Sequence, residues 1–312
     1  MEQDIKMSLE QLAPGHVTFD APLAPLTTFG LGGPAAALVE PGSIAGLAGV
    51  IKFARTKKLP LFLLAAGSNV LFRDGGFPGV VIKLGPEFAK LKLRPSEGDQ
   101  VTVEAGAAVP LARLVNLFRE EGLSGLEFLA GIPGSVGGAL NMNAGAFGGA
   151  ISDALSNLEF LNAESRLEVK SRNQLSFSYR HLDLPEGSII LKALFRLTRS
   201  TPSQVRNKIR KYLDSRRAKQ PTGLKSAGSV FKNPPVAPAG KLIDQAGLKG
   251  LTVGQAWISE KHANFIVHRG QARAGDVIKL IELVQAEIKK RFNVDLKTEI
   301  KIEGVDKETG SA

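Results

Sequence analysis

The stretch AGIPGSVGGALNMNAGAFGG at residues 130–149 contains seven glycines and no charged side chain. Glycine allows the backbone to adopt positive φ and to approach a ligand closely, and consecutive N–H groups in a tight turn favour anions such as a diphosphate. A flexible linker would be rich in Ser, Lys or Glu, whereas Ile, Val, Leu, Met and Phe recur in this stretch. We therefore predict an ordered ligand-binding loop, because the composition suits neither a solvated helix nor an amphipathic strand.

Two shorter loops of small residues precede this run. Ala66-Gly67-Ser68-Asn69 directly follows an apolar segment, Leu61 to Ala65, that predicts a buried strand. A glycine followed by small polar residues at the carboxyl end of a buried strand is a favourable seat for a phosphate. The second loop, Asp74 to Gly79, predicts a turn. Together with residues 130–149, these loops indicate a long ligand with a diphosphate in its middle.

The composition limits the class of protein and the kinds of site. A chain of 312 residues has room for two or three domains, each with its own core. Cysteine is absent, which excludes disulfides and thiolate chemistry. The four histidines, His16, His181, His262 and His268, include no closely spaced ligand pair, so we expect no metal site.

We expect neither a secretion signal nor a membrane span in this sequence. It starts with acidic residues, Glu2 and Asp4, in place of the basic and apolar run of a secretion signal. It has no stretch of about 18 apolar residues, so we expect no membrane span. A cytoplasmic location follows as an expectation.

The formal net charge of +10 indicates an anionic partner. The densest basic run, Arg206 to Lys219, lies on a helical pattern with one aromatic side chain, Tyr212. A single Trp and two Tyr leave the chain few side chains on which nucleic-acid bases could stack. We therefore expect small phosphorylated ligands, or a solvated basic surface, in preference to nucleic acid.

Apolar periodicity and turn residues predict a chain that mixes helices and strands. A short helix and a loop are expected in residues 1–20, and Ser43 is a candidate cap for the helix that follows it. Other helices are expected at 44–57, 110–121, 202–217, 241–245 and 274–292, and Gly122 is expected to end the second of these. Strands are expected at 36–40, 61–65, 80–84, 101–105, 155–162, 167–169, 189–198, 265–268 and 299–302. The charged helix 202–217 predicts a domain boundary near residue 200.

Three other places carry side chains suited to binding anions or moving protons. Ser229 follows a glycine, and Lys232 and Asn233 are spaced to face an anion. That segment lacks the Gly-x-Ser-x-Gly nucleophile elbow and a neighbouring histidine, which disfavours a hydrolase. Arg180 ends a strand-like segment and could hold a carboxylate or phosphate bidentately, and Glu299 lies among lysines. Taken singly, a polar turn, a surface arginine and a solvated carboxylate are the commoner explanations.

Several motifs nevertheless occur in a specific order. They are Thr27-Thr28-Phe29 to Gly33, Ala66 to Asn69, Gly131 to Gly138, Asn143 to Ala146, Ser178 to Arg180, Ala227 to Pro234 and Lys261 to Val267. In this order they resemble the motifs of the UDP-N-acetylenolpyruvoylglucosamine reductase family, over about residues 20 to 305. Thr27 stands where the family has Asn, and Ala66 stands where it has the first Gly of its first flavin loop. One match alone is of moderate specificity, whereas all of them in register are specific.

The resemblance implies an α+β fold. It implies a two-subdomain FAD-binding domain of the vanillyl-alcohol-oxidase (PCMH) type, followed by a smaller α+β substrate-binding domain. We place an N-terminal extension at residues 1–20, the FAD-binding domain at 21–200 and the substrate-binding domain at 201–312. The segment from His181 to Pro185 is too short for the loop that some members insert after the position of Arg180. The chain is therefore expected to be of the loopless type.

The resemblance also implies the ligands and their binding residues. FAD is expected as the cofactor, NADPH as the reductant and a UDP-sugar as the substrate, bound by a monomer. The FAD is expected to be noncovalent, because relatives that attach it use a histidine in the first loop and this chain has none between His16 and His181. The implied cofactor-binding residues are Ala66, Gly67, Ser68, Asn69, Gly131, Ile132, Pro133, Gly134, Ser135, Gly137, Gly138, Asn143, Ala144 and Gly145. The implied substrate-binding residues are Tyr179, Lys232 and Asn233.

The implied activity is reduction of the enolpyruvyl group of UDP-N-acetylenolpyruvoylglucosamine to UDP-N-acetylmuramate, a step of peptidoglycan precursor synthesis. Ser229, Arg180 and Glu299 would be the catalytic residues. Ser229 would donate the proton, Arg180 would hold the substrate carboxylate, and Glu299 would orient the hydroxyl or be the proton source itself. Two alternatives stay open at this stage, a flavin oxidase that uses oxygen and a basic RNA- or DNA-binding module.

Overall fold

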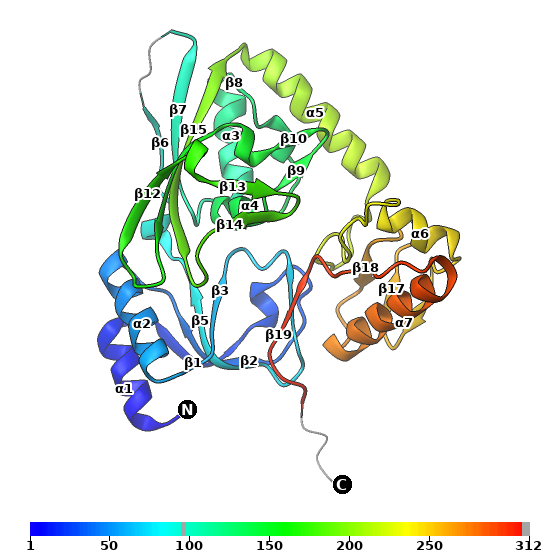
Figure 1. The fold of residues 1–312 in the computed structure, drawn as a ribbon, viewed down its shortest axis with the longest axis horizontal. Helices are drawn as coiled ribbons and strands as arrows, with labels where there is room; N and C mark the ends of the chain where they lie inside the picture. The colour runs from blue at the N-terminus through cyan, green and yellow to red at the C-terminus, as the bar shows by residue number, and fades with distance from the viewer. Residues whose placement is uncertain (95–97, 308–312) are drawn as a thin grey trace. The chain divides into compact units, whose positions relative to one another are not determined.

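The computed structural model describes residues 1–94 and 98–307, so the last five residues of the predicted C-terminal domain lie outside the described residues. The chain folds into two compact units of mixed helix and strand, which confirms the α+β prediction (Figure 1). Unit 1 comprises Met1–Val17, Val39–Ala66 and Ile82–Arg216, and unit 2 comprises Thr18–Leu38, Gly67–Val81 and Arg217–Ala312. Segments far apart in the sequence therefore share a unit. The division into residues 1–20, 21–200 and 201–312 stays a prediction.

The centre of unit 1 is an antiparallel sheet (Figure 1). Its strands follow the order β12 (Leu167–Ser171), β11 (Leu155–Leu161), β15 (Ile189–Arg199), β7 (Gln100–Gly106) and β6 (Leu91–Arg94), and β8 (Leu123–Ser124) pairs with the end of β15. Successive side chains of a strand point to opposite faces of the sheet. One face buries Val103, Phe160 and Phe195 in the core of unit 1. The strands predicted at 101–105, 155–162, 167–169 and 189–198 are confirmed.

Helix α3 (Leu111–Glu121) covers this core and ends at a glycine, as predicted. Gly122 has φ 65° and ψ 44°, and its N–H donates to the carbonyl of Phe118. This left-handed conformation is the one that a helix C-terminus commonly requires, and glycine adopts it without strain. The long helix α5 (Pro202–Lys219) contributes Val205 and Ile209 to the same core.

Two helices near the N-terminus pack together, α1 (Gln3–Leu12) and α2 (Ile44–Thr56). The predicted cap of α2 is confirmed, because Ser43 Oγ accepts the N–H of Gly46 at 3.0 Å. A Cβ on Gly49 would lie 2.9 Å from Leu12 Cδ2, so a glycine at this position lets the helices approach closely.

The glycine-rich run contains more regular structure than the sequence predicts. It holds helix α4 (Val136–Asn141) and a hairpin of β9 (Gly145–Ala146) and β10 (Gly149–Ala150). The prediction of a loop throughout is therefore wrong. Glycine disfavours a helix interior, but Leu140 and its apolar neighbours in α4 are buried, and tertiary burial rather than propensity stabilises most short helices.

A four-stranded sheet has the order β1 (Val17–Pro22), β2 (Pro34–Val39), β5 (Phe77–Lys83) and β3 (Leu61–Leu64). The strands predicted at 36–40, 61–65 and 80–84 are confirmed, with shifted ends. Two predictions fail at their edges, because the loop expected before residue 20 is already β1, and the turn expected up to Gly79 ends where β5 begins at Phe77. Val80, Val81 and Ile82 are fully buried in β5, and burial of β-branched side chains outweighs the local turn signal of Gly and Pro.

Unit 2 contains a small antiparallel sheet of β16 (Thr252–Val253), β17 (Ala256–Ile258) and β18 (Ile266–His268). Helix α7 (Ala274–Phe292) packs against this sheet and has the predicted ends, and α6 (Ala239–Gln245) starts two residues before the predicted range. Asp74 caps α7, since its two carboxylate oxygens accept the N–H groups of Ala274 and Gly275 at 3.0 Å. A parallel pair, β4 (Val70–Phe72) and β19 (Lys301–Glu303), completes the unit.

The remaining elements are short. β13 (Ser176–Ser178) and β14 (His181–Asp183) form a hairpin. Single 3-10 turns occupy Ala24–Leu26, Pro86–Phe88, Glu127–Leu129, Ile151–Asp153 and Arg172–Gln174. Across residues 1–94 and 98–307, no helix is both long enough and apolar enough to cross a bilayer.

Candidate active site

The first predicted flavin loop requires a glycine at its centre. Gly67 has φ 63°, and a Cβ at this position would lie 2.0 Å from the carbonyl oxygen of Leu26 and 2.8 Å from Thr27 Cα. The Gly67 carbonyl accepts the N–H of Thr28 at 3.0 Å. The loop is therefore folded tightly against residues 26–28, and any larger residue would clash with backbone atoms. The family motif that begins at Thr27 and the flavin loop thus form one structure.

Asn69 connects this loop to the C-terminal end of the chain. Its Nδ2 donates to the carbonyl of Glu299 at 3.1 Å, and its carbonyl accepts the N–H of Lys301 at 3.0 Å. The chain continues directly into the parallel pair of β4 and β19. The first loop and Glu299, 230 residues apart in sequence, therefore lie side by side.

The residues that follow Ser229 pair with the residues around Glu299. The N–H of Glu299 donates to the carbonyl of Val230 at 2.7 Å, and the N–H of Lys232 donates to the carbonyl of Lys297 at 2.9 Å. Phe231 and Thr298 form an antiparallel bridge between these hydrogen bonds. Ser229 and Glu299 are both half-buried, so two predicted catalytic residues flank a single backbone pairing.

The two predicted substrate-binding residues of this segment have different surroundings. Lys232 is half-buried next to the backbone pairing. Asn233 is exposed, and its Oδ1 accepts the N–H of Ala239, the first residue of α6, at 3.0 Å. The side-chain oxygen of Asn233 therefore helps to fix the start of helix α6.

His268, to which the sequence assigned no role, fixes the chain before Ser229. Residues Lys225 and His268 exchange backbone hydrogen bonds of 3.1 and 3.2 Å. His268 Nδ1 accepts the N–H of Gly270 at 2.9 Å, so Nε2 carries the proton and donates to the carbonyl of Phe29 at 2.7 Å. The side chain is fully buried, and burial lowers the pKa of His268 although the hydrogen bond to Phe29 opposes the shift. A neutral imidazole therefore links three segments of unit 2.

The second predicted flavin loop lies in unit 1 and is also tightly packed. Gly131 has φ 77°, and a Cβ there would lie 2.9 Å from Arg216 Cδ. Arg216 itself donates to the carbonyls of Phe128 and Ala130 at 3.2 and 2.9 Å. A Cβ on Gly137 would lie 2.9 Å from Ala107 Cβ. The backbone of this run therefore approaches its neighbours at several glycines, which leaves little room for other side chains.

The other predicted cofactor-binding residues of the run surround these glycines. Ser135 is buried at the start of α4, where its Oγ accepts the N–H of Gly138 at 3.5 Å. Gly134 has a positive φ of 153°. Ile132 and Ala144 are half-buried, and Pro133 is exposed. Ala66 and Ser68 of the first loop are exposed and half-buried, respectively.

Asn143 provides an observation that points to a ligand. It has a positive φ of 39°, and its Nδ2 donates to the carbonyl of Ser178 at 3.1 Å. Its Oδ1 is buried and has no hydrogen-bond partner among the described residues. An unpaired buried acceptor costs free energy unless a donor reaches it. The amide, hydroxyl and ring N–H donors of FAD fit this requirement, so the run is compatible with the predicted cofactor.

Arg180 and Tyr179 lie next to this end of the run. Arg180 has φ 58°, and its Nη1 donates to the carbonyl of Gly145 at 3.4 Å. The guanidinium carbon lies 5.1 Å from the centre of the Tyr179 ring, a cation–π geometry. Tyr179 is 52% exposed, so its hydroxyl-bearing ring is open to a ligand.

The predicted site residues thus form two groups. Unit 1 brings the second flavin loop together with Tyr179 and Arg180. Unit 2 brings the first loop from Gly67 onward together with Ser229, Glu299 and the segment after Ser229. Ala66 belongs to unit 1, although its neighbour Gly67 belongs to unit 2.

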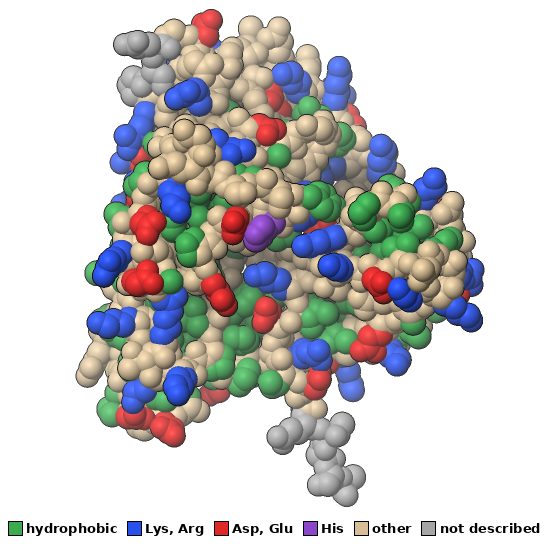
Figure 2. Space-filling model, viewed as in Figure 1, with side chains coloured by type: hydrophobic (Ala, Val, Ile, Leu, Met, Phe, Trp, Pro, Cys, Tyr) green, Lys and Arg blue, Asp and Glu red, His purple; other side chains and the backbone are tan. Residues whose placement is uncertain are grey.

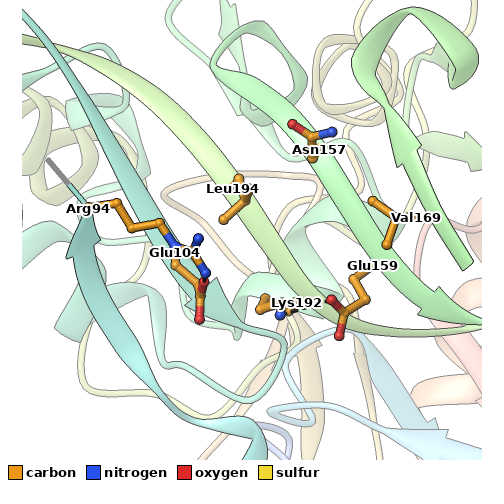
Figure 3. Close-up of a pocket in the computed structure, with 7 residues that line it drawn as sticks. All are labelled: Arg94, Glu104, Asn157, Glu159, Val169, Lys192 and Leu194. Atoms are coloured by element: carbon orange, nitrogen blue, oxygen red, sulfur yellow. Dashed lines mark hydrogen bonds and ion pairs between the residues drawn. The ribbon is translucent and has the colours of Figure 1, made fainter. Parts of the chain in front are cut away.

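A pocket on the open face of the six-stranded sheet contains none of the predicted site residues (Figure 3). Lys192 and Glu159 form an ion pair of 2.8 Å across it, and Arg94 pairs with Glu104. Basic and acidic side chains are likewise interspersed over the face shown in Figure 2. Among the described residues, no group of His, Asp or Glu side chains could hold a metal ion. The ion pairs at the pocket and the mixed charges in Figure 2 are typical of a solvated surface.

Comparison with known proteins matches two families to separate parts of the chain. Residues 35–169 match an FAD binding domain, and residues 220–303 match UDP-N-acetylenolpyruvoylglucosamine reductase, C-terminal domain. A UDP-N-acetylenolpyruvoylglucosamine reductase from Syntrophus aciditrophicus (strain SB) is 44% identical over 302 residues, which cover 97% of this chain and 96% of the relative. A second one, from Caldanaerobacter subterraneus subsp. tengcongensis, is 40% identical over 296 residues, which cover 95% of this chain and 96% of the relative.

Solved structures are similar as well. The crystal structure of UDP-N-acetylenolpyruvylglucosamine reductase from Thermus caldophilus has a TM-score of 0.77 and 37% identity, covering 92% of this chain and 98% of that one. A VAO-type flavoprotein from Myceliophthora thermophila C1 has a TM-score of 0.50 and 13% identity, covering 96% of this chain and 63% of that one. The second likeness concerns the fold alone, and together with the match to an FAD binding domain it confirms the predicted fold type.

Proposed function

Since the chain belongs to the UDP-N-acetylenolpyruvoylglucosamine reductase family, we propose that it reduces the enolpyruvyl group of UDP-N-acetylenolpyruvoylglucosamine to UDP-N-acetylmuramate in peptidoglycan precursor synthesis. It is an oxidoreductase with an FAD-binding domain. One observation carries the proposal for the site: the backbone pairing of Val230 with Glu299 fixes Ser229 and Glu299 beside the first flavin loop. A serine hydroxyl and a glutamate carboxylate carried by two neighbouring, paired backbone segments suit delivery of a proton to carbon.

We propose that residues of both loops hold a noncovalent FAD. In the first loop these are Ala66, Gly67, Ser68 and Asn69, and in the second they are Gly131, Ile132, Pro133, Gly134, Ser135, Gly137, Gly138, Asn143, Ala144 and Gly145. When bound, FAD supplies the transfer of two electrons from NADPH to the substrate alkene. The unpaired Oδ1 of Asn143 supports this proposal, because it needs a donor that the described residues do not provide.

The chain's own residues supply the charge stabilisation and the proton. Reduction of the alkene builds negative charge on one carbon and its carboxylate, and the Arg180 guanidinium holds that carboxylate with charge-assisted hydrogen bonds. Ser229 donates its hydroxyl proton to the carbanion-like carbon, which is a strong enough base to accept it. Glu299 orients that hydroxyl, or is itself the proton source. Tyr179, Lys232 and Asn233 bind the nucleotide-sugar, and Lys232 offers its ammonium to the diphosphate.

The spectrum of the purified protein tests this function. We expect a yellow protein, slow bleaching by NADPH, and return of the colour when UDP-N-acetylenolpyruvoylglucosamine is added. A colourless protein that takes up no added FAD would contradict the proposal. Rapid peroxide formation in air would indicate an oxidase, and salt-sensitive binding of RNA or DNA would indicate a nucleic-acid module.

Four further properties of the protein do not concern the reaction itself. A monomeric state, a cytoplasmic location and the absence of a nucleic-acid partner are proposed, as is a site of the loopless type. On the face shown in Figure 2, basic and acidic side chains are interspersed, and a nucleic-acid surface would instead gather basic side chains on one stripe.

A further inference from the structure

Asn264, in the motif Lys261 to Val267, grips the backbone immediately after Ser229. Its Nδ2 donates to the carbonyl of Phe231 at 2.8 Å, and its Oδ1 accepts the N–H of the same residue at 2.9 Å. The backbone carbonyl of Asn264 accepts the N–H of Val230 at 2.9 Å. The side chain is 3% exposed. A buried amide thus replaces the hydrogen bonds that a neighbouring strand would make.

The opposite edge of the same segment is paired with the residues around Glu299. Val230 accepts the N–H of Glu299, and Phe231 forms its bridge to Thr298. The segment from Val230 to Lys232 therefore has hydrogen-bond partners on both sides, as a central strand does. Gly228, on the other flank of Ser229, has φ 76°, and a Cβ at this position would meet no described atom within 4 Å. Ser229 thus lies between an open glycine turn and a segment clamped on both edges.

The turn that presents Asn264 is itself fixed by hydrogen bonds. His262 Nδ1 accepts the N–H of Asn264 at 3.2 Å, and the carbonyl of His262 accepts the N–H of Phe265 at 3.0 Å. Ser259 Oγ accepts the N–H groups of Lys261 and His262 at 3.2 and 3.4 Å. The amide of Asn264 is therefore preorganised for its two bonds to Phe231, which limits the freedom of that backbone.

We propose that Asn264 is the positioning residue that sets the Ser229 hydroxyl for proton delivery. The inference rests on the proposed function, and Asn264 acts through the backbone of Val230 and Phe231 rather than on the substrate. Without its side chain, the buried N–H and carbonyl of Phe231 lose their partners. The segment then shifts at the flexible Gly228 side, and the hydroxyl of Ser229 moves out of line with the carbon that takes the proton.

The test separates the two half-reactions by stopped-flow absorbance in Asn264→Leu. We expect flavin reduction by NADPH to keep its rate, and reoxidation by UDP-N-acetylenolpyruvoylglucosamine at saturation to slow by about 10- to 100-fold, the loss that a small misplacement causes. The half-saturating substrate concentration should not change. In a Ser229→Ala background, the same substitution should slow reoxidation no further, because both changes remove one proton delivery.

Asn162→Leu is the matched control. Asn162, in unit 1, is also a buried asparagine, with bonds of 2.7 Å to Glu168 and 2.9 Å from the N–H groups of Glu164 and Arg166. It should lower stability while leaving reoxidation unchanged. If Asn264→Leu fails to fold, Asn264→Asp serves, because it keeps an acceptor for the Phe231 N–H and replaces the donor to the Phe231 carbonyl with a carboxylate oxygen.

Three outcomes overturn the inference. Reoxidation can remain at the wild-type rate in the folded variant, it can slow to the same degree in Asn162→Leu, or the loss can multiply with that of Ser229→Ala. Failure of the wild-type protein to react with the sugar nucleotide overturns the proposed function, and the inference with it. A reactive wild type combined with any of the three outcomes overturns the inference alone.

Discussion

The glycine-rich run of unit 1 and the Ser229 segment of unit 2 are assembled differently. Within the run, the N–H of Ala144 donates to the carbonyl of Ala139 at 2.7 Å, and β9 turns back directly onto β10. The Ser229 segment instead obtains its hydrogen-bond partners from Asn264 and from Glu299. Neighbours in sequence form much of the first region, whereas the second exists only where three distant segments meet.

This difference separates binding from catalysis. The run packs against distant residues such as Arg216 and Ala107, but several of its backbone hydrogen bonds are local and its glycines allow close approach to a ligand. Its ligand class can therefore be inferred from its composition. A proton donor must instead be held in line with the reacting atom, and small displacements are costly. The segments that fix Ser229 lie far from it in sequence, so substitutions far from Ser229 should alter its chemistry.

The largest effect is expected in the Ser229 segment, at Ser229 itself. Ser229→Ala should slow reoxidation of the reduced enzyme by the sugar nucleotide about 10²- to 10⁴-fold, because the proton donor is lost. Flavin reduction by NADPH should be nearly unchanged, as measured by stopped-flow absorbance. Ser226→Ala, three positions earlier, is the control and should affect neither step. Equal losses in both half-reactions would show that Ser229 is structural.

Gly67→Ala tests how far the first loop depends on close packing. The new Cβ would lie 2.0 Å from the Leu26 carbonyl oxygen at a φ of 63°, so we expect about 3 kcal/mol of destabilisation in urea unfolding. Gly228→Ala is the matched control, because it has a similar φ of 76° and open space around it. It should cost only about 1 kcal/mol, the strain of a left-handed conformation. Similar losses at the two positions would argue against the backbone clash.

Glu127 lies in the 3-10 turn just before the glycine-rich run, and its substitution tests whether this part of unit 1 depends on a buried charge. Burial raises the pKa of Glu127, but hydrogen bonds from Ser124 and the Gly125 N–H, at 2.7 and 2.8 Å, outweigh it and hold the pKa below the ordinary 4.5. Its stabilisation is therefore present above pH 4.5 and is lost as the pH falls through the lowered pKa. Glu127→Gln should cost about 2 kcal/mol at neutral pH.

Urea unfolding of wild type and Glu127→Gln across the acid range measures this difference. The difference in stability between the two proteins should narrow as the pH falls from 4.5 through the lowered pKa of Glu127, since the carboxylate takes up its proton over that range. Glu121→Gln, at an exposed position, is the control. A gap that does not change with pH would show that the charge of Glu127 is irrelevant.

The smallest effect is expected at the unpaired acceptor of the glycine-rich run. Asn143→Gly removes the buried Oδ1 and tolerates the positive φ of 39°. If FAD donates to that oxygen, its dissociation constant should rise about tenfold, the loss of one hydrogen bond. Titration of the apoprotein with FAD, followed by flavin fluorescence, measures this. Asn141→Gly, at an exposed position in α4, should bind FAD as tightly as wild type, and equal affinity in Asn143→Gly would remove Asn143 from the site.

Much of the fold could be predicted where local signals suffice. The helix at 274–292, the Ser43 cap and the glycine stop at Gly122 are all confirmed. The cap and the stop depend on residues within one turn of each other, and the helix depends on the apolar periodicity of its own residues, so the sequence contains these signals. The failures arise where burial overrides local preference, as in α4 within the glycine-rich run and at the early start of β5.

The candidate site shows the same limit. The sequence indicated Ser229 and Glu299 through an ordered resemblance, but nothing in it pairs Val230 with Glu299 or joins Asn69 to Glu299 and Lys301. The hydrogen bonds of His268 and Asn264 could not be predicted either, because a histidine or an asparagine beside apolar residues does not indicate its distant partner.

The sequence by itself determined where glycine lets the backbone approach a ligand, the Ser43 and Gly122 helix ends, the missing thiol chemistry and the class of ligand, because each depends on residue type and short spacing. Only the tertiary structure decided which backbone groups Asn69, Asn264 and His268 hold. Hydrogen-bond partners are chosen when the folded chain brings remote segments within roughly 3 Å, the length of one such bond. Residue identity sets what a side chain can donate or accept, and the fold sets to whom.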